Sequence, residues 1–290
     1  MDTLPSTGTT PDTWVIEPRQ DGFSARLRDF WRYRNLLRFF ASKAVAKMYR
    51  RTVLGSTWIF IRPLFPLAVN TIVFGGVLGV GSHGVPYFLF LTTGNALWDL
   101  FASSLMWGTR SLELNRGFLT KIYVPRLIMP VSSMTPAYVN FAINLGVLAC
   151  AQVYYLFTTG TIYFTPAKFG WALLALVMSS ILSLGLSLWT SVPALQARDI
   201  RFSLGYVLSL WVFLTPVLYP LTLPARFAKY AWMMSLNPMA AIVNAFKYGV
   251  LGLPVLNIRD LAISGAITLV VFFGGLAFFG RAEGTAADKV

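Results

Sequence analysis

The sequence has few of the residues from which metal centres, cofactor sites and hydrolytic sites are built. Its 290 residues include one cysteine, Cys150, one histidine, His83, and 11 acidic residues. A lone cysteine inside an apolar run provides neither a disulfide framework nor a thiolate metal cluster. The Gly-rich loop GxxxxGK[ST] that binds nucleotide phosphates is absent, and so is the GxSxG turn of serine hydrolases. We therefore expect no metal ion, no cofactor and no bound nucleotide in this chain.

Charged residues are also scarce. They make up 12% of the chain, against roughly a quarter in a soluble domain, whereas 56% of residues are apolar and 15% aromatic. This composition predicts an all-α integral membrane protein. The net charge of +13 raises the question of nucleic-acid binding, which needs cations gathered on one solvated face. Here the cations lie in the first 51 residues and in short connections between apolar runs, so no nucleic-acid partner is expected.

A helix needs about 20 apolar residues to cross a bilayer, and six apolar runs reach or nearly reach this length. The predicted spans are residues 56–80, 86–107, 131–157, 170–192, 202–221 and 261–280, in a transmembrane domain of residues 55–280. Arg62, Pro63 and Pro66 interrupt the first run, which predicts a broken start or a hydrated, protein-lined region there. Asp99 lies near the middle of the second run, where a carboxylate belongs either to a functional site or to a helix-pairing contact.

The first 54 residues contain no predicted span. Residues 1–22 begin with a stretch rich in Ser, Thr and Pro, and they are predicted to form a flexible cytoplasmic segment. In residues 23–54 apolar residues recur at helical spacing, with arginine and lysine between them. A basic face opposite an aromatic and aliphatic face is typical of a helix that lies in the membrane interface. A helix packed on a soluble domain is the alternative, but this sequence offers no such domain.

The basic residues also predict the orientation of the spans. With the amino terminus inside, the inner segments hold 18 lysines and arginines and the outer connections hold five, with Arg62 unassigned. Because cytoplasmic loops carry such an excess, both termini are expected in the cytoplasm, including a tail of residues 281–290. Lys247 is one of the five cations assigned to the outer side.

A polar stretch separates the second and third predicted spans. Residues 111–130 hold three cations and one acid, Glu113, and residues 111–122 are compatible with a helix that Pro125 stops. A basic, amphipathic hairpin tip at the cytoplasmic face suits contact with a partner protein. A solvated basic loop is the simpler interpretation.

The stretch before the last span has two apolar pieces, Ala225–Leu236 and Met239–Leu251, on either side of Asn237-Pro238. Each has about 12 residues, too few to cross a bilayer, so residues 225–251 are predicted to form two re-entrant helices that dip in from the outer side. One span kinked at Pro238 is the alternative, and it would place the carboxyl terminus outside.

Aromatic residues are abundant inside the predicted spans. Core packing, the aromatic belts at membrane–water interfaces and stacking on sugar rings in a channel each explain their presence, and the sequence does not separate these roles. The candidates for a channel lining are Phe65, Trp98, Phe101, Trp107, Tyr206 and Trp211.

Several short strings match one family in their order and spacing. They are Tyr33-Arg34-Asn35-Leu36-Leu37; Tyr49–Gly55 with Trp58 and Pro63-Leu64; Ser111-Leu112, Asn115, Leu119 and Lys121–Arg126, ending at Pro130; Arg198-Asp199; Thr215–Pro220; and Leu236–Ala240. On these strings the chain resembles the membrane subunit of type-2 ABC exporters for polysaccharides, the family of O-antigen, capsule and teichoic acid permeases. The departures, Met48 in the basic run and Gln196-Ala197 before Arg198, are modest.

The resemblance implies a homodimeric permease of the cell inner membrane that works with two copies of a separate ABC ATPase, which carries the ATP and Mg. Residues 111–122 would be the coupling helix in a cleft of that ATPase, with residues 193–201 as a second contact. The implied coupling residues are Ser111, Leu112, Glu113, Leu114, Asn115, Arg116, Leu119, Lys121, Tyr123, Arg126, Arg198 and Asp199.

The helix of residues 23–54 would then flank a lateral entrance to the channel. The basic residues implied at this entrance are Arg32, Arg34, Arg38, Lys47, Arg50 and Arg51, which would attract an anionic diphosphate. The expected substrate is a polysaccharide on a polyprenyl-diphosphate or lipid carrier, with O-antigen favoured over capsule.

Two other functions fit parts of the sequence. A type-2 ABC exporter of drugs or small lipids would share the layout, but it is expected to lack the basic interface helix and a string like Leu119–Arg126. A membrane-embedded glycosyltransferase or acyltransferase would need acids or histidines clustered near a membrane face, whereas Asp99 and Asp260 are isolated.

Overall fold

The computed structural model describes residues 33–49, 58–119, 126–220 and 235–287, and every regular element in these ranges is a helix. The first part contains α2 (Arg34–Tyr49), α3 (Trp58–Asn70), the π-helix η2 (Thr71–Val77), α4 (Tyr87–Thr109), α5 (Ser111–Leu114), α6 (Arg116–Leu119) and α7 (Ile128–Ser133). The second part contains α8 (Thr135–Thr159), the 3-10 turn η3 (Pro166–Lys168), α9 (Phe169–Gln196), α10 (Asp199–Trp211), the 3-10 turn η4 (Val212–Leu214), α12 (Pro238–Leu251) and α13 (Ile258–Ala287).

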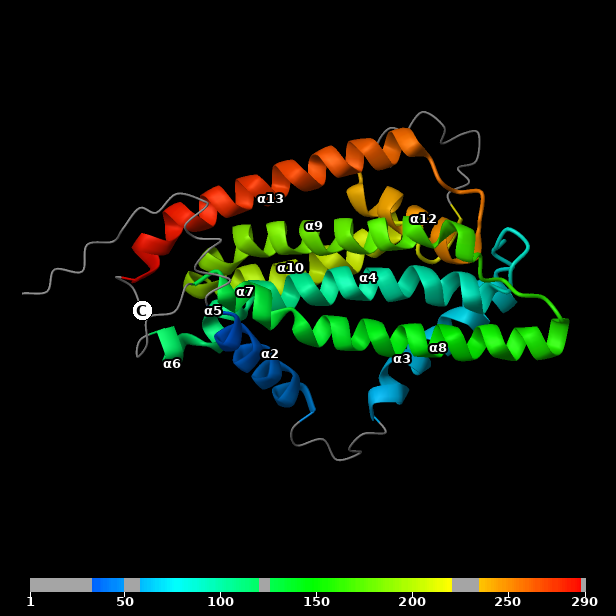
Figure 1. The fold of residues 1–290 in the computed structure, drawn as a ribbon, viewed down its shortest axis with the longest axis horizontal. Helices are drawn as coiled ribbons and strands as arrows, with labels where there is room; N and C mark the ends of the chain where they lie inside the picture. The colour runs from blue at the N-terminus through cyan, green and yellow to red at the C-terminus, as the bar shows by residue number, and fades with distance from the viewer. Residues whose placement is uncertain (1–32, 50–57, 120–125, 221–234, 288–290) are drawn as a thin grey trace, which may run out of the picture.

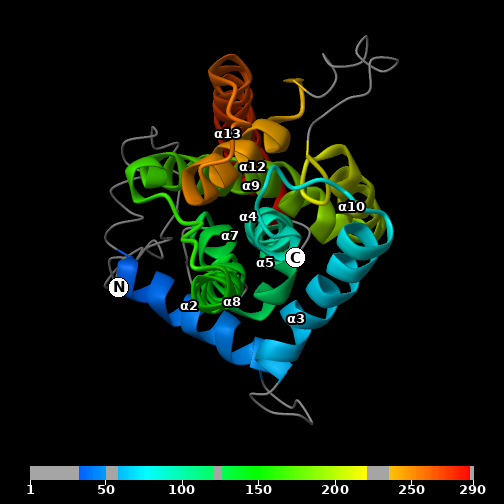
Figure 2. The same ribbon diagram turned by 90° about the vertical axis from the view of Figure 1, so that its right-hand side faces the viewer.

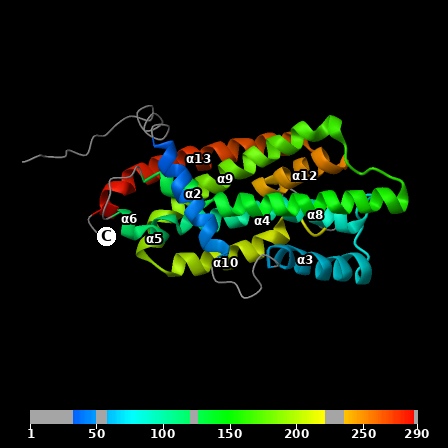
Figure 3. The same ribbon diagram turned by 60° about the horizontal axis from the view of Figure 1, so that its bottom comes forward.

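The long helices α4, α8, α9 and α13 run along the bundle, with α4 and α9 in its middle (Figure 1). One end of the bundle holds α5, α6 and the last turns of α13, and we call it the hairpin end. The opposite end holds the loops of residues 78–86, 160–165 and 252–257. α2 lies obliquely across the bundle near the hairpin end (Figure 3).

Within the described residues, three helical segments are long and apolar enough to cross a membrane: Ile128–Thr159, Pro166–Gln196 and Ile258–Ala282. α4 is of similar length but more polar, and its neighbours enclose it so closely that Leu97 and Phe101 are 0% exposed. Two of its polar side chains bond to each other, since the Asn95 amide donates to the Asp99 carboxylate at 2.8 Å. This bond satisfies part of the hydrogen-bonding capacity of the Asp99 carboxylate, which lies one turn after Asn95 on the same helix.

Glycines allow α9 to approach its neighbours closely. A Cβ atom added at Gly185 would lie 2.8 Å from Cα of Phe272 on α13, and one at Gly275 would lie 2.5 Å from the Gly185 carbonyl oxygen. A Cβ atom at Gly249 on α12 would collide with the backbone of Ala172. Small residues at such crossings let helix backbones meet, which is how helices associate where lipid removes the hydrophobic driving force.

The helix ends differ from the predicted spans in three places. α9 continues past Val192 and through Pro193 to Gln196, so residues 193–196 are not a connection. The helix from Asp199 stops at Leu214 rather than residue 221, because Pro216 disfavours the helical conformation at Thr215, whose φ and ψ are −110° and 136°. α13 extends to Ala287, so most of the predicted tail is helical.

The stretch before the last span is described only in part. α12 coincides with the second predicted half-length helix, while the first, Ala225–Leu236, lies outside the described residues as far as residue 234. The assignment of Lys247 to the outer connections was wrong, because its side chain is 1% exposed and lies inside the bundle. The charge count treated it as a loop residue, but backbone carbonyl groups bind its ammonium group.

Gly185→Ala is expected to lower the stability by about 1–3 kcal/mol, the usual cost of overpacking, because the backbone of Phe272 cannot move aside cheaply. Gly146→Ala on α8 is the matched control, since nothing lies within 4 Å of its added carbon. Alanine should be neutral or stabilising there. Thermal unfolding of the purified protein in detergent measures both, and equal midpoints would contradict the close approach of α9 to α13.

Candidate functional site

The polar hairpin between α4 and α7 consists of two short helices, α5 and α6, at one end of the bundle (Figure 1). Over its described residues it is not the single helix predicted for 111–122. At Asn115 the backbone leaves the helical conformation, with φ −117°, and the side-chain amide donates to the Ser111 carbonyl at 2.9 Å. This local bond competes with the helix ladder, as asparagine side chains often do.

The base of the hairpin is buried. Ser111 is 0% and Leu112 2% exposed, and Leu112 belongs to an apolar cluster with residues from α2, α7, α9 and α13. The other buried members of this cluster are Phe40, Ile128, Met129, Leu188, Val192 and Phe279. On α6, by contrast, Arg116 and Gly117 are exposed. The hairpin therefore has one face fixed on the bundle and one face open to a partner.

Lys43 on α2 attaches the amphipathic helix to the hairpin. Its ammonium group lies 3.9 Å from the centre of the Phe118 ring and donates to the Asn115 side-chain oxygen at 3.3 Å. Phe40, Phe39 and Phe118 meet edge-to-face beside it. Burial, with a smaller effect of the Lys47 charge, lowers the pKa of Lys43. The sequence interpretation counted Lys43 only among the cations of the amphipathic helix and assigned it to no site, although it stands three residues after Phe40 on the same helix.

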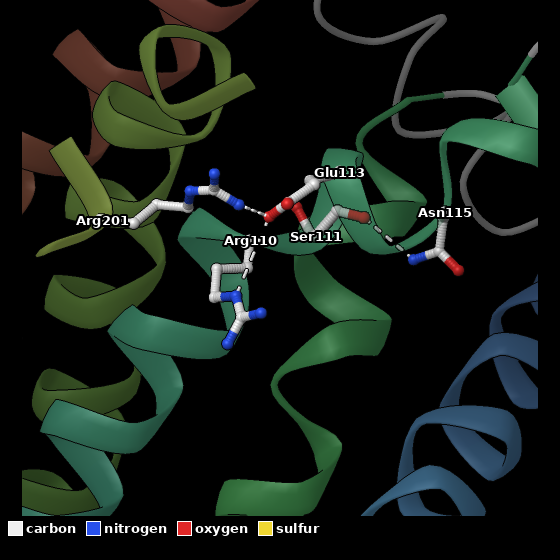
Figure 4. Close-up of polar contacts among 5 residues, drawn as sticks. All are labelled: Arg110, Ser111, Glu113, Asn115 and Arg201. Carbon is white, nitrogen blue, oxygen red and sulfur yellow. Dashed lines mark hydrogen bonds and ion pairs between the residues drawn. The ribbon is translucent and has the colours of Figure 1, made fainter. Parts of the chain in front are cut away.

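Glu113 attaches the hairpin to α10. Its carboxylate pairs with the guanidinium group of Arg201 in the first turns of α10, and Arg110 lies 3.9 Å away on the other side (Figure 4). The hydrogen bond from Arg201 is the main reason that the pKa of Glu113 is lowered. Arg201 lies within the predicted second contact of residues 193–201 but was not singled out there.

The lowered pKa gives this attachment a pH dependence of known sign. A carboxyl group with a depressed pKa in the folded protein stabilises it above the ordinary pKa of glutamate, about 4.3. That stabilisation is lost as the pH falls through the folded-state pKa. The Glu113 attachment is therefore complete at neutral pH.

The remaining predicted coupling residues lie around this centre or outside the described ranges. Arg198 is the residue before α10 and Asp199 its first residue, next to Arg201. Leu114 is half-buried on α5, and Arg126 precedes α7. Lys121 and Tyr123 lie outside the described residues, as does the side chain of Leu119.

The predicted entrance residues divide in the same way. Arg34, Arg38 and Lys47 are exposed on α2, whereas Arg32, Arg50 and Arg51 lie outside the described residues. α2 packs against α7 and α8, so its cations border the hairpin end of the bundle (Figure 3).

The six aromatic candidates occupy two kinds of place. Trp98 and Phe101 are 6% and 0% exposed and form a cluster with the half-buried Trp211, with ring centres 5.4–6.3 Å apart. Phe65 on α3 and Tyr206 on α10 are 70% and 75% exposed, and Trp107 is half-buried. Only Phe65 and Tyr206 thus present most of their side chain at the bundle surface.

The site contains groups for binding and holding rather than for bond breaking. Within the described ranges no three His, Cys, Asp or Glu side chains lie close enough together to hold a metal ion. The hairpin presents an exposed basic surface, and its other residues contact α2, α9 and α10.

Comparison with known proteins agrees with this arrangement. The family model described as ABC-2 type transporter matches residues 35–251, which include α2, the hairpin, α10 and α12. This chain belongs to the ABC-2 type transporter family. It is a transport permease, not an enzyme, and the ATPase activity of such a transporter belongs to a separate subunit.

Similar proteins carry more specific names. An O-antigen export system permease protein RfbA of Klebsiella pneumoniae is 27% identical over 251 residues, 85% of this chain and 92% of that protein. A protein of the same name from Myxococcus xanthus is 26% identical over 222 residues, 76% and 82% of the two chains. The inner membrane transport permease YadH of Escherichia coli K12 is 25% identical over 233 residues, 77% and 83%.

Glu113→Gln is expected to raise backbone hydrogen exchange in residues 111–119, because the neutral amide loses the charge that binds Arg201. Exposed ion pairs stabilise only modestly, so an increase of about 1.5- to 5-fold is expected at neutral pH. Arg281→Gln removes an exposed arginine from the same end of the bundle and should leave this peptide unchanged. Exchange measured by mass spectrometry on the purified chain tests both variants, and no change in the Glu113 variant would contradict the attachment.

Proposed function

We propose that this chain is the membrane subunit of an exporter of lipid-linked polysaccharide, with O-antigen as the favoured substrate, in the cell inner membrane. The observation that carries the proposal is the family match over residues 35–251, with relatives named O-antigen export permeases along most of their length. Two copies of the chain form the channel, and two copies of a separate ATPase, which binds the ATP and Mg, drive it. The carrier of the glycan is a polyprenyl diphosphate or another lipid.

The proposed topology has six spans and both termini in the cytoplasm. Besides the three apolar segments, it uses α3 with η2, α4, and α10 with η4. These elements alternate in direction along the bundle, and the hairpin, the start of α10 and the end of α13 lie together at one end (Figure 1). The excess of basic residues in the inner segments supports a cytoplasmic hairpin end.

In this proposal the hairpin is the contact with the ATPase. Its exposed face on α6 meets the partner, and its buried base passes any displacement to α2, α9 and α10, which contact it directly. ATP binding draws the two ATPase subunits together and moves both hairpins. The mechanism requires no chemistry in the chain itself.

The channel is proposed to lie between the two copies, along the face formed by α3 and α10, which lie on the same side of the bundle (Figure 2). This face exposes large apolar side chains, including Leu64, Phe65, Phe202, Tyr206 and Leu210. Phe65 and Tyr206 are retained as lining residues, because ring faces pack against the C–H groups of sugars. Trp98 and Phe101 are left out, because their own protomer encloses them.

The glycan carrier is proposed to enter beside α2. Its exposed cations, with those of the neighbouring segments, attract the anionic diphosphate and anionic lipid headgroups. Each lysine or arginine near an anionic surface contributes about 1 kcal/mol. The alternative of a membrane-embedded transferase is excluded by membership of a transport family, and an exporter of small lipids or drugs is the competing substrate class.

The function is tested by deleting the gene. Loss of surface polysaccharide together with accumulation of the lipid-linked glycan inside the cell is expected, with recovery when the intact gene is restored. Unchanged surface polysaccharide, with altered export of small lipids or drugs, would contradict the substrate and favour the competing class.

Arg116→Glu is expected to reduce co-purification of the ATPase by at least about tenfold, because reversing an exposed interface charge brings like charges together and costs several kcal/mol. Arg259→Glu makes the same change on an exposed arginine at the opposite end of the bundle and should have no effect. Retention of the ATPase by both variants would show that the hairpin is only a connection.

Replacing Arg34 and Arg38 together by glutamine is expected to slow export about fivefold or more, because each cation near the anionic surface contributes about 1 kcal/mol. Assembly of the dimer should be unchanged, since both side chains are exposed on α2. Initial rates of glycan export in complemented cells measure the effect. Normal export with both cations removed would exclude an entrance role for this part of α2.

A further inference from the structure

α10 begins beside the hairpin, where Arg201 pairs with Glu113, and its other end stops inside the bundle. After η4 the chain continues through Thr215, Pro216, Val217 and Leu218, all of which are buried, without forming a helix. Backbone carbonyl groups of such a segment have no helical partners. In a bundle surrounded by lipid they also have no water, and each unpaired group costs several kcal/mol.

Side chains from other parts of the chain take up these carbonyl groups. The ammonium group of Lys247, in the middle of α12, donates to the carbonyl oxygens of Pro216 at 2.7 Å and Val217 at 3.2 Å. Its nitrogen also lies 3.3 Å from the centre of the Phe90 ring on α4. Tyr87 donates to the Leu218 carbonyl at 2.5 Å. The lysine thus has two backbone acceptors and an aromatic face.

Asn237, immediately before α12, holds the same segment from the other side. Its amide nitrogen donates to the Leu214 carbonyl at 2.9 Å and lies 3.1 Å from the Thr215 hydroxyl. Its side-chain oxygen accepts from the indole of Trp211 at 2.9 Å and from the backbone amide of Met239 at 3.1 Å. Asn237 therefore caps α12 and joins it to the end of α10. We call the bonds made by Asn237 and Lys247 the latch.

Between its two ends α10 is loosely held. Leu208 is its only buried residue, while Phe202, Tyr206 and Leu210 are 69–75% exposed. The ion pair of Arg201 with Glu113 fixes the start, and the latch fixes the end. A helix is stiff along its axis, so a displacement at its start reaches its end.

We propose that α10 transmits the position of the hairpin to α12, with Arg201 as its attachment at the hairpin and Asn237 and Lys247 as its attachment at the far end. Lys247 and Asn237 are positioning residues in this view: they contact neither the partner nor the substrate. Movement of the hairpin shifts α10 along its axis, and the latch carries the shift to the start of α12. The role of this movement in polysaccharide export rests on the proposed function.

A thiol placed beside the latch reports the movement without any transport. Cys150 is exposed and is removed by Cys150→Ser, after which Leu236→Cys provides a single thiol at an exposed position next to Asn237. The rate of maleimide labelling is measured on the purified chain in lipid nanodiscs, with no ATPase and no glycan. A labelling rate that does not respond would therefore contradict only the role of α10, whereas a negative result in the export experiment would contradict the proposed function.

Arg201→Gln is expected to change the labelling rate at position 236 by about 2- to 5-fold, the range of an exposed ion pair. Arg281→Gln, the matched arginine on α13, should leave the rate unchanged. In a chain that also carries Lys247→Met, the effect of Arg201→Gln should become smaller, because Asn237 alone then joins the end of α10 to α12. Trp211→Phe, which removes the bond to Asn237 but keeps an aromatic ring beside Trp98 and Phe101, should also reduce that effect and serves if the methionine variant does not fold.

Two results would overturn the proposal. One is an unchanged labelling rate when Arg201 alone is replaced. The other is an equal effect of Arg201→Gln with and without the latch, which would reflect general loosening of the bundle rather than transmission through α10.

Discussion

A helix that stops inside an apolar bundle must find partners for its last carbonyl groups, and this requirement shapes the bundle around the end of α10. The carbonyls of Leu214, Pro216, Val217 and Leu218 are taken by side chains of α4, α12 and the residue that caps α12. A lysine is suited to this because one ammonium group carries three donors. The position of α12 is therefore tied to the position where α10 ends. Without the latch the carbonyl groups of Leu214, Pro216 and Val217 would lack their side-chain donors.

At the hairpin end the chain uses a different chemistry. Apolar packing around Leu112 holds the base of the hairpin. Two polar contacts, made by Asn115 and Glu113, join the hairpin to α2 and α10. These contacts are at least partly exposed, so water and salt weaken them and they can change at small cost. A surface that must respond to a partner is better served by such contacts than by a second buried network.

The sequence predicted the long helices well, because runs of apolar residues and the spacing of charges report directly on burial. α4, α8, α9 and α13 lie close to their predicted ranges, and the hairpin lies between α4 and α7 as expected. The early end of the helix at Leu214 was missed, since the run of residues 202–221 is apolar throughout and hides the effect of Pro216. The division of the hairpin at Asn115 depends on one side-chain bond to Ser111, which a helix-compatible composition conceals. The partners of Glu113, Asn115 and Lys247 come from distant parts of the chain, and one sequence carries no record of such pairs.

The two attachments of α10 differ in strength, and the difference gives the helix a direction. The ion pair at its start is partly exposed, with the Arg201 and Glu113 side chains 15% and 38% exposed, so solvent weakens it more than it weakens a fully buried contact. At its end the Lys247 bonds of the latch are buried, and opening them would leave carbonyl groups and an ammonium group without partners in an apolar environment. The Lys247 bonds therefore stay closed whenever the ion pair at Arg201 holds. α10 and the start of α12 should accordingly move together, and the contact at Arg201 sets how much of the hairpin movement reaches them.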